Sequence, residues 1–325
     1  MVTGAKGFVG SALCRRLQDS GCLVRGALRE TARCSSHDGS THDGIEWVIL
    51  HDQSSEEQTR QSLKGVEVII HLAARVHVMA DTSADPLHEF RKVNVVWTER
   101  LARTATAEGV RRFVYLSSIK VNGEQSMIPF TERDLPNPQG AYGRSKWEAE
   151  QALAMVSSQT GLETVVIRSP LVYGPGVGGN FLQLLNFLEK GIPLPLAGVE
   201  NRRSLIYRGN LVDALSCCVH GRLAAGQTYL ISDGEDLSTP ELIRRLGKAL
   251  EFSACLWPLP LSMLCGIGQL IGKQAVFDRL LRSLQVDSSK IRKGLDWHPP
   301  FSVDQGLAET ATWFRARTTN RSMVS

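Results

Sequence analysis

Short apolar runs alternate with longer amphipathic segments along the first half of the chain. Five runs have the length and the β-branched content of strands, and they cover residues 23–28, 45–50, 66–72, 112–117 and 164–168. Three segments have the period of helices with one buried face, and they cover residues 8–20, 86–108 and 142–159. This alternation predicts an α/β fold with a doubly wound parallel sheet and helices on both of its faces.

The pattern changes after residue 168, where prolines and glycines crowd into residues 170–179. Helices are predicted at 181–190, 239–250 and 276–284, and the apolar segments 204–207 and 228–231 could return to the parallel sheet. We therefore expect a smaller, mostly helical C-terminal lobe that is interleaved in sequence with the sheet domain. The expected division is a sheet domain of residues 1–171 with segments near 204–232, a second lobe of 172–203 and 233–318, and a frayed tail at 319–325.

Composition narrows the class of protein. With 42% hydrophobic and 22% charged residues, the chain has the make-up of a soluble globular protein, and a net charge of +4 with scattered arginines argues against a nucleic-acid partner. The seven cysteines include no C-x-x-C pair and we see no signal peptide, so we expect a cytoplasmic protein. Cys34, His37 and His42 can be weighed as metal ligands, but they lie in a polar loop without a fourth ligand at the usual spacing, so no metal is expected.

One long segment, residues 252–272, contains no charged residue and has the length of a membrane span. Pro258, Pro260 and Gly266 interrupt it, which disfavours a continuous spanning helix. We predict a buried helical hairpin in the second lobe. Contact with a membrane surface or with a lipid-linked substrate is the alternative.

Glycines recur at every third position near the start of the chain, at Gly4, Gly7 and Gly10. Where a strand passes into a helix, such glycines permit a tight turn, close approach of backbone N–H groups to a pyrophosphate, and close packing of the helix on the sheet. The spacing predicts dinucleotide binding. Because only Met1 and Val2 precede the loop, we also expect that the natural start lies a few codons upstream.

The end of the second predicted strand bears on the choice of cofactor. An acidic residue there binds the ribose 2′-hydroxyl of NAD, whereas arginine accommodates the 2′-phosphate of NADP. The sequence offers Arg29 and then Glu30, so NADP is favoured, with NAD the alternative if Glu30 makes the ribose contact. Asp52, after the next strand, is a candidate partner for the adenine amino group.

Tyr142 and Lys146 stand four residues apart at the start of a predicted helix, so their side chains share one face. A phenol with a pKa near 10 is a poor acid or base at neutral pH, but a neighbouring ammonium and an oxidised nicotinamide would both favour its phenolate. Ser118 closes a predicted strand at the sheet edge where doubly wound folds bind ligands. The three residues are therefore candidates for proton transfer at a reacting oxygen.

Together these motifs resemble the extended short-chain dehydrogenase/reductase family, the NAD(P)-dependent epimerases and dehydratases of nucleotide sugars, which have a Rossmann-type sheet domain. The matching segments are residues 3–10 (TGAKGFVG), 71–74 (HLAA), Asn94, 116–118 (LSS), 142–146 (YGRSK) and 168–176 (RSPLVYGPG).

The resemblance implies roles for individual residues. Ser118, Tyr142 and Lys146 would be catalytic, and Ser118, Asn180 and Arg203 would contact the substrate, with Arg203 on its diphosphate. The implied cofactor contacts are Gly4, Lys6, Gly7, Phe8, Val9, Gly10, Arg29, Asp52, Leu72, Ala73, Ala74, Asn94, Tyr142, Lys146 and Pro170. The sheet domain would bind the cofactor and the second lobe the substrate, and the family suggests a homodimer.

Two departures limit the resemblance. Asn122 precedes Gly123 where the sugar 4-epimerases usually have tyrosine, and Arg29 replaces the aspartate of many NAD-using members. Both fit better with members from bacterial surface polysaccharide clusters, including 4-keto-sugar reductases. We expect hydride chemistry at C4 of a UDP-linked hexose, and reduction and epimerisation remain open. A dehydratase is disfavoured because Ile119 and Lys120, not an acid, follow Ser118; a non-catalytic redox sensor or assembly factor is the further alternative.

Overall fold

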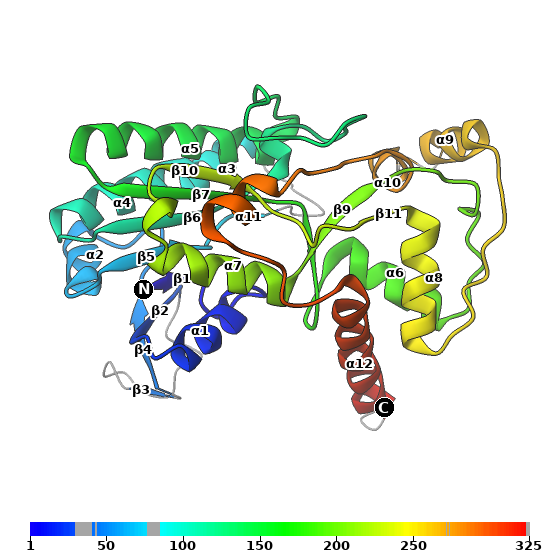
Figure 1. Ribbon diagram of the computed structural model, residues 1–325, viewed down its shortest axis with the longest axis horizontal. Coiled ribbons are helices and arrows are strands. Elements are labelled where there is room, and N and C mark those ends of the chain that lie inside the picture. The colour runs from blue at the N-terminus through cyan, green and yellow to red at the C-terminus, as the bar shows by residue number, and fades with distance from the viewer. Residues whose placement is uncertain (30–40, 43, 77–84, 271, 273, 323–325) are drawn as a thin grey trace.

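Two sheets organise the chain, and Figure 1 shows them side by side with helices packed around them. The computed structural model describes residues 1–29, 41–42, 44–76, 85–270, 272 and 274–322. In the larger sheet the strand order is β10-β7-β6-β5-β1-β2-β4-β3. Its strands are β1 (Val2–Thr3), β2 (Val24–Leu28), β3 (Thr41–His42), β4 (Ile45–Ile49), β5 (Val68–His71), β6 (Arg112–Ser118), β7 (Glu163–Ser169) and β10 (Gln227–Leu230).

This strand order confirms the doubly wound parallel sheet. The chain moves from β1 to β2 and β4 in one direction, and from β5 to β6, β7 and β10 in the other. All neighbours are parallel except the two-residue edge strand β3, which runs antiparallel to β4. The reversal of direction lies between β1 and β5, where Thr3 is paired with His71. Ligands of such sheets bind outside the carboxyl ends of the strands at this switch point.

Helices cover both faces of the larger sheet (Figure 1). Helices α1 and α7 pack against each other on one face, and α2, α4 and α5 pack together on the other. Each face has its own buried apolar cluster, as continuous parallel strands require. The helices of this part of the chain are α1 (Gly10–Asp19), α2 (Glu56–Leu63), α3 (Pro86–Arg91), the π-helical η2 (Lys92–Val96), α4 (Trp97–Ala107), η3 (Ile119–Val121), α5 (Gly140–Thr160), α7 (Arg208–His220), η4 (Arg222–Ala224) and α11 (Ser289–Leu295).

A separate apolar cluster forms the core of the second lobe. Its small sheet has the order β11-β9-β8. The elements are β8 (Leu171–Tyr173), β9 (Arg203–Tyr207), β11 (Asp236–Leu237), α6 (Gly179–Glu189), α8 (Thr239–Leu250), α9 (Leu261–Leu270), α10 (Gln274–Leu281) and α12 (Val303–Ser322).

The expectation that two later segments return to the larger sheet is correct for one of them and wrong for the other. Strand β10 pairs with β7 in the larger sheet, whereas β9 pairs with β8 and β11. Pro170, between β7 and β8, has no N–H to continue a ladder. The chain leaves the larger sheet at this residue, so β9 finds its partner in β8.

The predicted frayed tail is wrong for the residues up to Ser322, because α12 continues to that residue. Leu307, Ala311 and Phe314 are buried in the second-lobe cluster, and α12 packs against α8. Residues 323–325 lie outside the described part of the chain. Burial of one apolar stripe therefore orders a helix whose other side chains are mostly polar.

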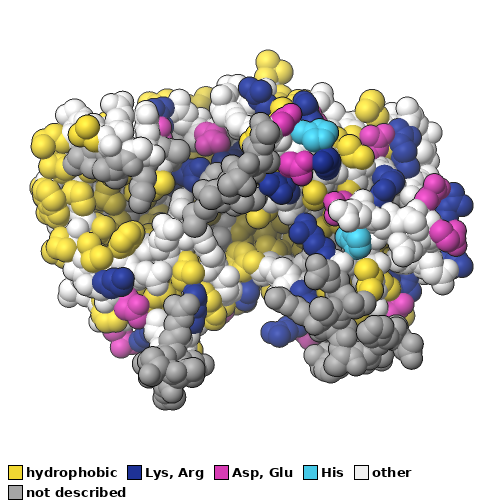
Figure 2. Space-filling model, turned by 180° about the vertical axis from the view of Figure 1, so that it is seen from behind, with side chains coloured by type: hydrophobic (Ala, Val, Ile, Leu, Met, Phe, Trp, Pro, Cys, Tyr) yellow, Lys and Arg dark blue, Asp and Glu magenta, His cyan; other side chains and the backbone are white. Residues whose placement is uncertain are grey.

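The predicted buried hairpin at residues 252–272 is also wrong. Helix α9 buries Leu264, but Leu261 is 49% exposed and Met263 is 54% exposed. Before the helix, the backbone of residues 255–257 pairs with residues 194–197, which leaves Trp257 44% exposed. Hydrophobic side chains gather at this end of the molecule in Figure 2. Among the helices of the described residues, none is long and apolar enough to cross a membrane.

The packing of α12 leads to a prediction about the stability of the protein. Phe314→Ala should lower the free energy of unfolding by roughly 3–5 kcal/mol, because the ring is 1% exposed and its removal leaves a cavity. Leu270→Ala, at a side chain that is 88% exposed, serves as the control and should change it by less than about 0.5 kcal/mol. Urea denaturation of both variants measures the difference. Equal values would show that α12 is not part of the core.

Candidate active site

The glycine loop joins β1 to α1 at the switch point of the sheet. Gly4 adopts φ +66, a conformation that favours glycine, and a Cβ there would lie 3.0 Å from the backbone nitrogen of Ala73. A Cβ on Gly10 would lie 2.1 Å from the carbonyl oxygen of Gly4. Val9 is the N-cap of α1, and no side chain of the described residues caps that helix end. The loop therefore fits the pyrophosphate of a dinucleotide, which takes backbone N–H groups and a positive helix end.

A buried hydroxyl ties this loop to the next strand. Thr3 Oγ1 accepts the backbone N–H groups of Leu72 and Ala73, both at 3.2 Å, and lies 2.8 Å from Nδ1 of His71. Since its lone pairs are taken, the hydroxyl donates to Nδ1, and Nε2–H of His71 donates to Thr98 Oγ1 at 3.0 Å. The sequence motif placed His71 correctly before the turn but did not indicate the roles of Thr3 and Thr98.

Tyr142, Ser118 and Lys146 come together at the carboxyl end of β6. Both Tyr142 and Lys146 lie in the first two turns of α5, and Ser118 is the last residue of β6. Burial raises the pKa of Tyr142 to about 12, and a hydrogen bond with Ser118 opposes this shift. In the protein alone the phenol is therefore a weaker acid than free tyrosine.

Lys146 is buried beneath the start of α5. Its Nζ donates to the carbonyl oxygen of Leu116 at 2.8 Å and lies 4.4 Å from the centre of the Tyr115 ring. Burial lowers the pKa of Lys146 to about 7, and the negative charge of Glu150 acts in the opposite direction. The ammonium is thus partly deprotonated near neutral pH in the protein alone.

Asn94 links the turn after β5 to the helix that carries Tyr142. Its side chain accepts the Arg75 N–H at 2.8 Å and donates to the Arg75 carbonyl and to Ser145 Oγ. Asn94 lies in the π-helical turn η2, which interrupts the predicted single helix over residues 86–108. The Asn94 side chain is buried there, and π-turns are frequent at functional sites.

Comparison with known proteins assigns the family. The model of the NAD dependent epimerase/dehydratase family matches residues 1–232. A UDP-glucose 4-epimerase of Vibrio cholerae is 40% identical over 320 residues, which cover 97% of this chain and 94% of that protein. The chain belongs to the NAD-dependent epimerase/dehydratase family. The resemblance drawn from the sequence motifs is confirmed.

Solved structures with the epimerase fold superpose on nearly the whole chain. The UDP-glucuronic acid 4-epimerase of Bacillus cereus, solved with NAD, has a TM-score of 0.78 at 21% identity, covering 97% of this chain and 98% of its own. The UDP-glucose 4-epimerase of Thermotoga maritima, solved with UDP-glucose, has a TM-score of 0.77 at 22% identity and covers 98% of both chains. These likenesses support the fold of this family member.

Other predicted cofactor residues occupy the same edge of the sheet. Arg29 follows β2 and is exposed, while Glu30 lies outside the described residues. Asp52 is half-buried, and its backbone carbonyl accepts a hydrogen bond from Arg100 at 2.7 Å. Phe8 of the glycine loop lies under the guanidinium of Arg208, 5.4 Å from ring centre to Cζ. Cys34 and His37 of the weighed metal cluster lie outside the described residues.

Of the three predicted substrate residues, Ser118 ends β6, and the other two lie on two elements of the second lobe. Asn180 is exposed in the first turn of α6. Arg203 begins β9, and its guanidinium donates to the carbonyl of Arg282 at 2.9 Å. Burial and the neighbouring charge of Arg279 lower the pKa of Arg203, while Glu124 raises it. A half-buried arginine beside a second cation is suited to an anionic ligand.

A buried ion pair next to Ser118, Tyr142 and Lys146 has no counterpart in the sequence prediction. Arg168 on β7 and Glu150 on α5 approach to 2.6 Å with side chains that are 6% and 5% exposed. Ser117 Oγ donates to the same carboxylate, and Arg168 donates to Asn122 Oδ1 at 3.0 Å. Asn122, which replaces the usual tyrosine of the 4-epimerases, is thus held in this network. Spacing along the sequence does not reveal the pair, because its members come from different elements.

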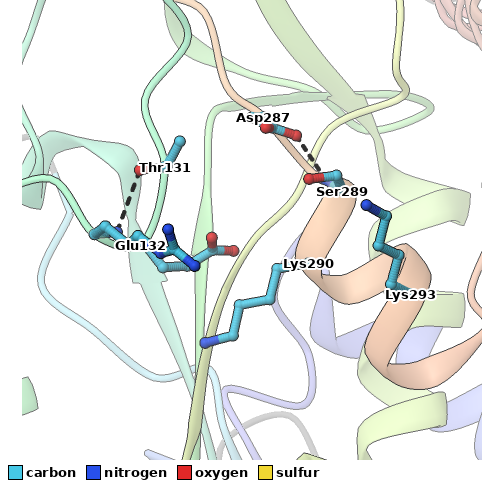
Figure 3. Close-up of a pocket in the computed structure, with 7 residues that line it drawn as sticks. Thr131, Glu132, Asp287, Ser289, Lys290 and Lys293 are labelled. Carbon is cyan, nitrogen blue, oxygen red and sulfur yellow. Dashed lines mark hydrogen bonds between the residues drawn. The ribbon is translucent and has the colours of Figure 1, made fainter.

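A separate cavity of about 640 Å³ lies between the loop after β6 and the start of α11. Figure 3 shows Lys290 and Lys293 projecting from α11, with Glu132 on the facing loop. Lys290 donates to the carbonyl of Thr228, and Glu132 accepts the N–H of Leu230, both at 2.8 Å. These charged groups bond the backbone of the edge strand β10, and the residues that line the cavity do not include Ser118, Tyr142 or Lys146.

The buried histidine makes the stability of the site depend on pH. Burial lowers the pKa of His71 from 6.5 to about 3. Between these values the unfolded chain binds a proton that the native protein does not. Above about pH 6.5 neither state binds this proton, so the free energy of unfolding has its full value. Below that pH it falls on acidification by up to about 1.4 kcal/mol per pH unit.

Urea denaturation at several pH values measures this slope, and His71→Asn should reduce it. His298→Asn, at an exposed histidine, is the matched control and should leave the slope unchanged. A slope that survives in His71→Asn would assign the pH dependence to other groups.

Proposed function

We propose that this chain is an NAD(P)-dependent enzyme that acts at C4 of a UDP-linked hexose, with epimerisation as its first candidate reaction. The observation that carries the proposal is the meeting of Ser118, Tyr142 and Lys146 beside a glycine loop at the switch point. The Vibrio cholerae relative is named as a UDP-glucose 4-epimerase, and two solved neighbours of the same fold are UDP-sugar 4-epimerases. These names support a UDP-sugar as substrate.

Residues of the glycine loop and of the turn after β5 would hold the cofactor. Gly4, Gly7 and Gly10 leave the backbone open to the pyrophosphate, and Ala73 faces the same space across Gly4. When bound, the nicotinamide supplies a hydride acceptor and donor together with a positive charge in its oxidised form. All proton transfers then belong to side chains of this chain.

Tyr142 would take the proton of the 4-hydroxyl as C4 is oxidised and return it when C4 is reduced. Ser118 would hydrogen-bond the same oxygen, as it does the phenol. Because burial alone raises the pKa of Tyr142, the phenolate requires positive charge nearby. Lys146, four residues along α5, supplies one such charge.

The second lobe would bind the nucleotide part of the substrate. Arg203, which is half-buried, would pair with the diphosphate, and Asn180 would contact it from α6. Figure 2 shows a hollow in the middle of the molecule, with a hydrophobic floor and Lys and Arg side chains around it.

We also propose that the chain divides into its two lobes near residue 171. We propose further that it forms a homodimer and that it acts in surface polysaccharide synthesis.

A 4-keto-sugar reductase is the second candidate function. It is favoured by Arg29, which is exposed directly after β2, where NADP enzymes carry a cation for the 2′-phosphate. A non-catalytic sensor is disfavoured by the presence of all three proton-handling residues. The two enzymatic candidates differ in cofactor balance, since an epimerase regenerates its cofactor and a reductase consumes NADPH.

The deciding experiment follows product and cofactor together. Purified protein is incubated with UDP-glucose, with UDP-N-acetylglucosamine and with a 4-keto-6-deoxy UDP-sugar, each with NAD and with NADPH. We expect a C4 epimer without net change in cofactor. Oxidation of NADPH in equal amount to product would instead establish the reductase, and absence of any product would contradict both.

Replacement of the phenol tests the acid–base assignment. Tyr142→Phe should fold and bind cofactor but lose about 10²–10⁴-fold in kcat, because the proton has no acceptor. Tyr229→Phe, which removes a hydroxyl bonded to the Leu223 carbonyl on the other face of the sheet, is the matched control and should keep its activity. Turnover by Tyr142→Phe close to that of the control would show that another group moves the proton.

A further inference from the structure

The ring of Tyr115, on the strand next to α5, lies against the Lys146 ammonium. Tyr115 and Phe113 alternate with Val114 along β6 and face the helices α4 and α5, whereas Val114 joins the cluster on the other face. Tyr115 is 0% exposed, and the Lys146 Nζ lies 4.4 Å from the centre of its ring. An ammonium over an aromatic ring at this distance is attracted by the negative face of the ring.

We propose that Tyr115 is a positioning residue of the active site: the face of its ring holds the Lys146 ammonium at the end of β6, from where it acts on Tyr142. The inference rests on the proposed function for its consequence in turnover. Its structural part, the hold of the ring on the ammonium, is measurable without any substrate.

The other groups around the Lys146 ammonium do not replace the ring in holding it in place. The Leu116 carbonyl takes one of three ammonium protons, at 2.8 Å. Glu150, one turn along α5, has its carboxylate bonded by Arg168 and Ser117. His71, stacked on Tyr115 with ring centres 5.9 Å apart, stays neutral because burial lowers its pKa to about 3.

The surroundings of the Tyr115 hydroxyl allow the effect of the ring to be tested separately from that of the hydroxyl. It is buried and has no hydrogen-bond partner among the described residues. Burial first, and then the charges of Tyr142 and Glu150, raise its pKa well above that of free tyrosine, so it remains protonated. Tyr115→Phe therefore removes a group that makes no hydrogen bond and keeps the aromatic face, whereas Tyr115→Leu keeps the apolar packing and removes the face.

The experiment measures the protonation of Lys146 directly. Protein with ¹³C-labelled lysine is titrated by NMR, and the Lys146 signal is assigned by its loss in Lys146→Met. The pKa of Lys146 is about 7 in the protein alone. We expect it to be retained in Tyr115→Phe and to fall by about one unit in Tyr115→Leu, so that the charged fraction at pH 7 drops from about a half to about a tenth.

Turnover supplies the second readout. With less ammonium present, the kcat of Tyr115→Leu should fall about fivefold at pH 7, and the high-pH limb of its profile should move about one unit toward acid. Tyr115→Phe should keep the profile. A purely structural loss would lower kcat equally at every pH.

Each outcome either supports or overturns the proposed role of Tyr115. An unchanged Lys146 pKa in folded Tyr115→Leu, or an equal fall in Tyr115→Phe, overturns the proposal. A lower pKa without any movement of the kcat profile supports the hold of the ring and counts against the role of Lys146 in the proposed function. If Tyr115→Leu fails to fold, Tyr115→Met takes its place in the titration, with the same two results to distinguish.

Discussion

One buried hydroxyl, that of Thr3, holds the carboxyl ends of β1 and β5 together, and the rest of the site depends on it. The two strands meet at the reversal of the sheet, where the hydroxyl accepts two N–H groups from the turn after β5. Without such a partner these amides would be buried donors with a cost of about 1–3 kcal/mol each. His71 completes the arrangement because it stays neutral and so can accept from Thr3 while donating to Thr98.

Much of this arrangement follows from local sequence. Gly4 and Gly10 are glycines because neighbouring backbone leaves no room for a Cβ, so their spacing indicated the loop directly. Tyr142 and Lys146 share a helix face by their separation alone. The parallel strands were predicted because burial on both faces leaves a continuous apolar run.

The errors have physical causes that no local pattern records. The segment at β9 has the composition of a sheet strand, and only the break at Pro170 decides which sheet it joins. The polar sequence of α12 conceals the apolar stripe that packs on α8. The π-turn around Asn94 shifts register by one residue within an otherwise regular helix, and the periodicity of residues 86–108 is too coarse to show it.

Burial sets the pKa values of both Tyr142 and Lys146 in the protein without its cofactor. The sequence argument relied on the ammonium and an oxidised nicotinamide together; burial alone lowers the pKa of Lys146 to about 7 and raises that of Tyr142 to about 12. Glu150 is close enough to restore some of the positive charge, yet its carboxylate is bonded by Arg168. The anion is thereby kept from pairing with Lys146, which leaves the ammonium to the Leu116 carbonyl and the Tyr115 ring. In the proposed mechanism, an ammonium held by an oxygen and a ring face keeps its positive charge available to Tyr142, whereas pairing with a carboxylate would offset that charge.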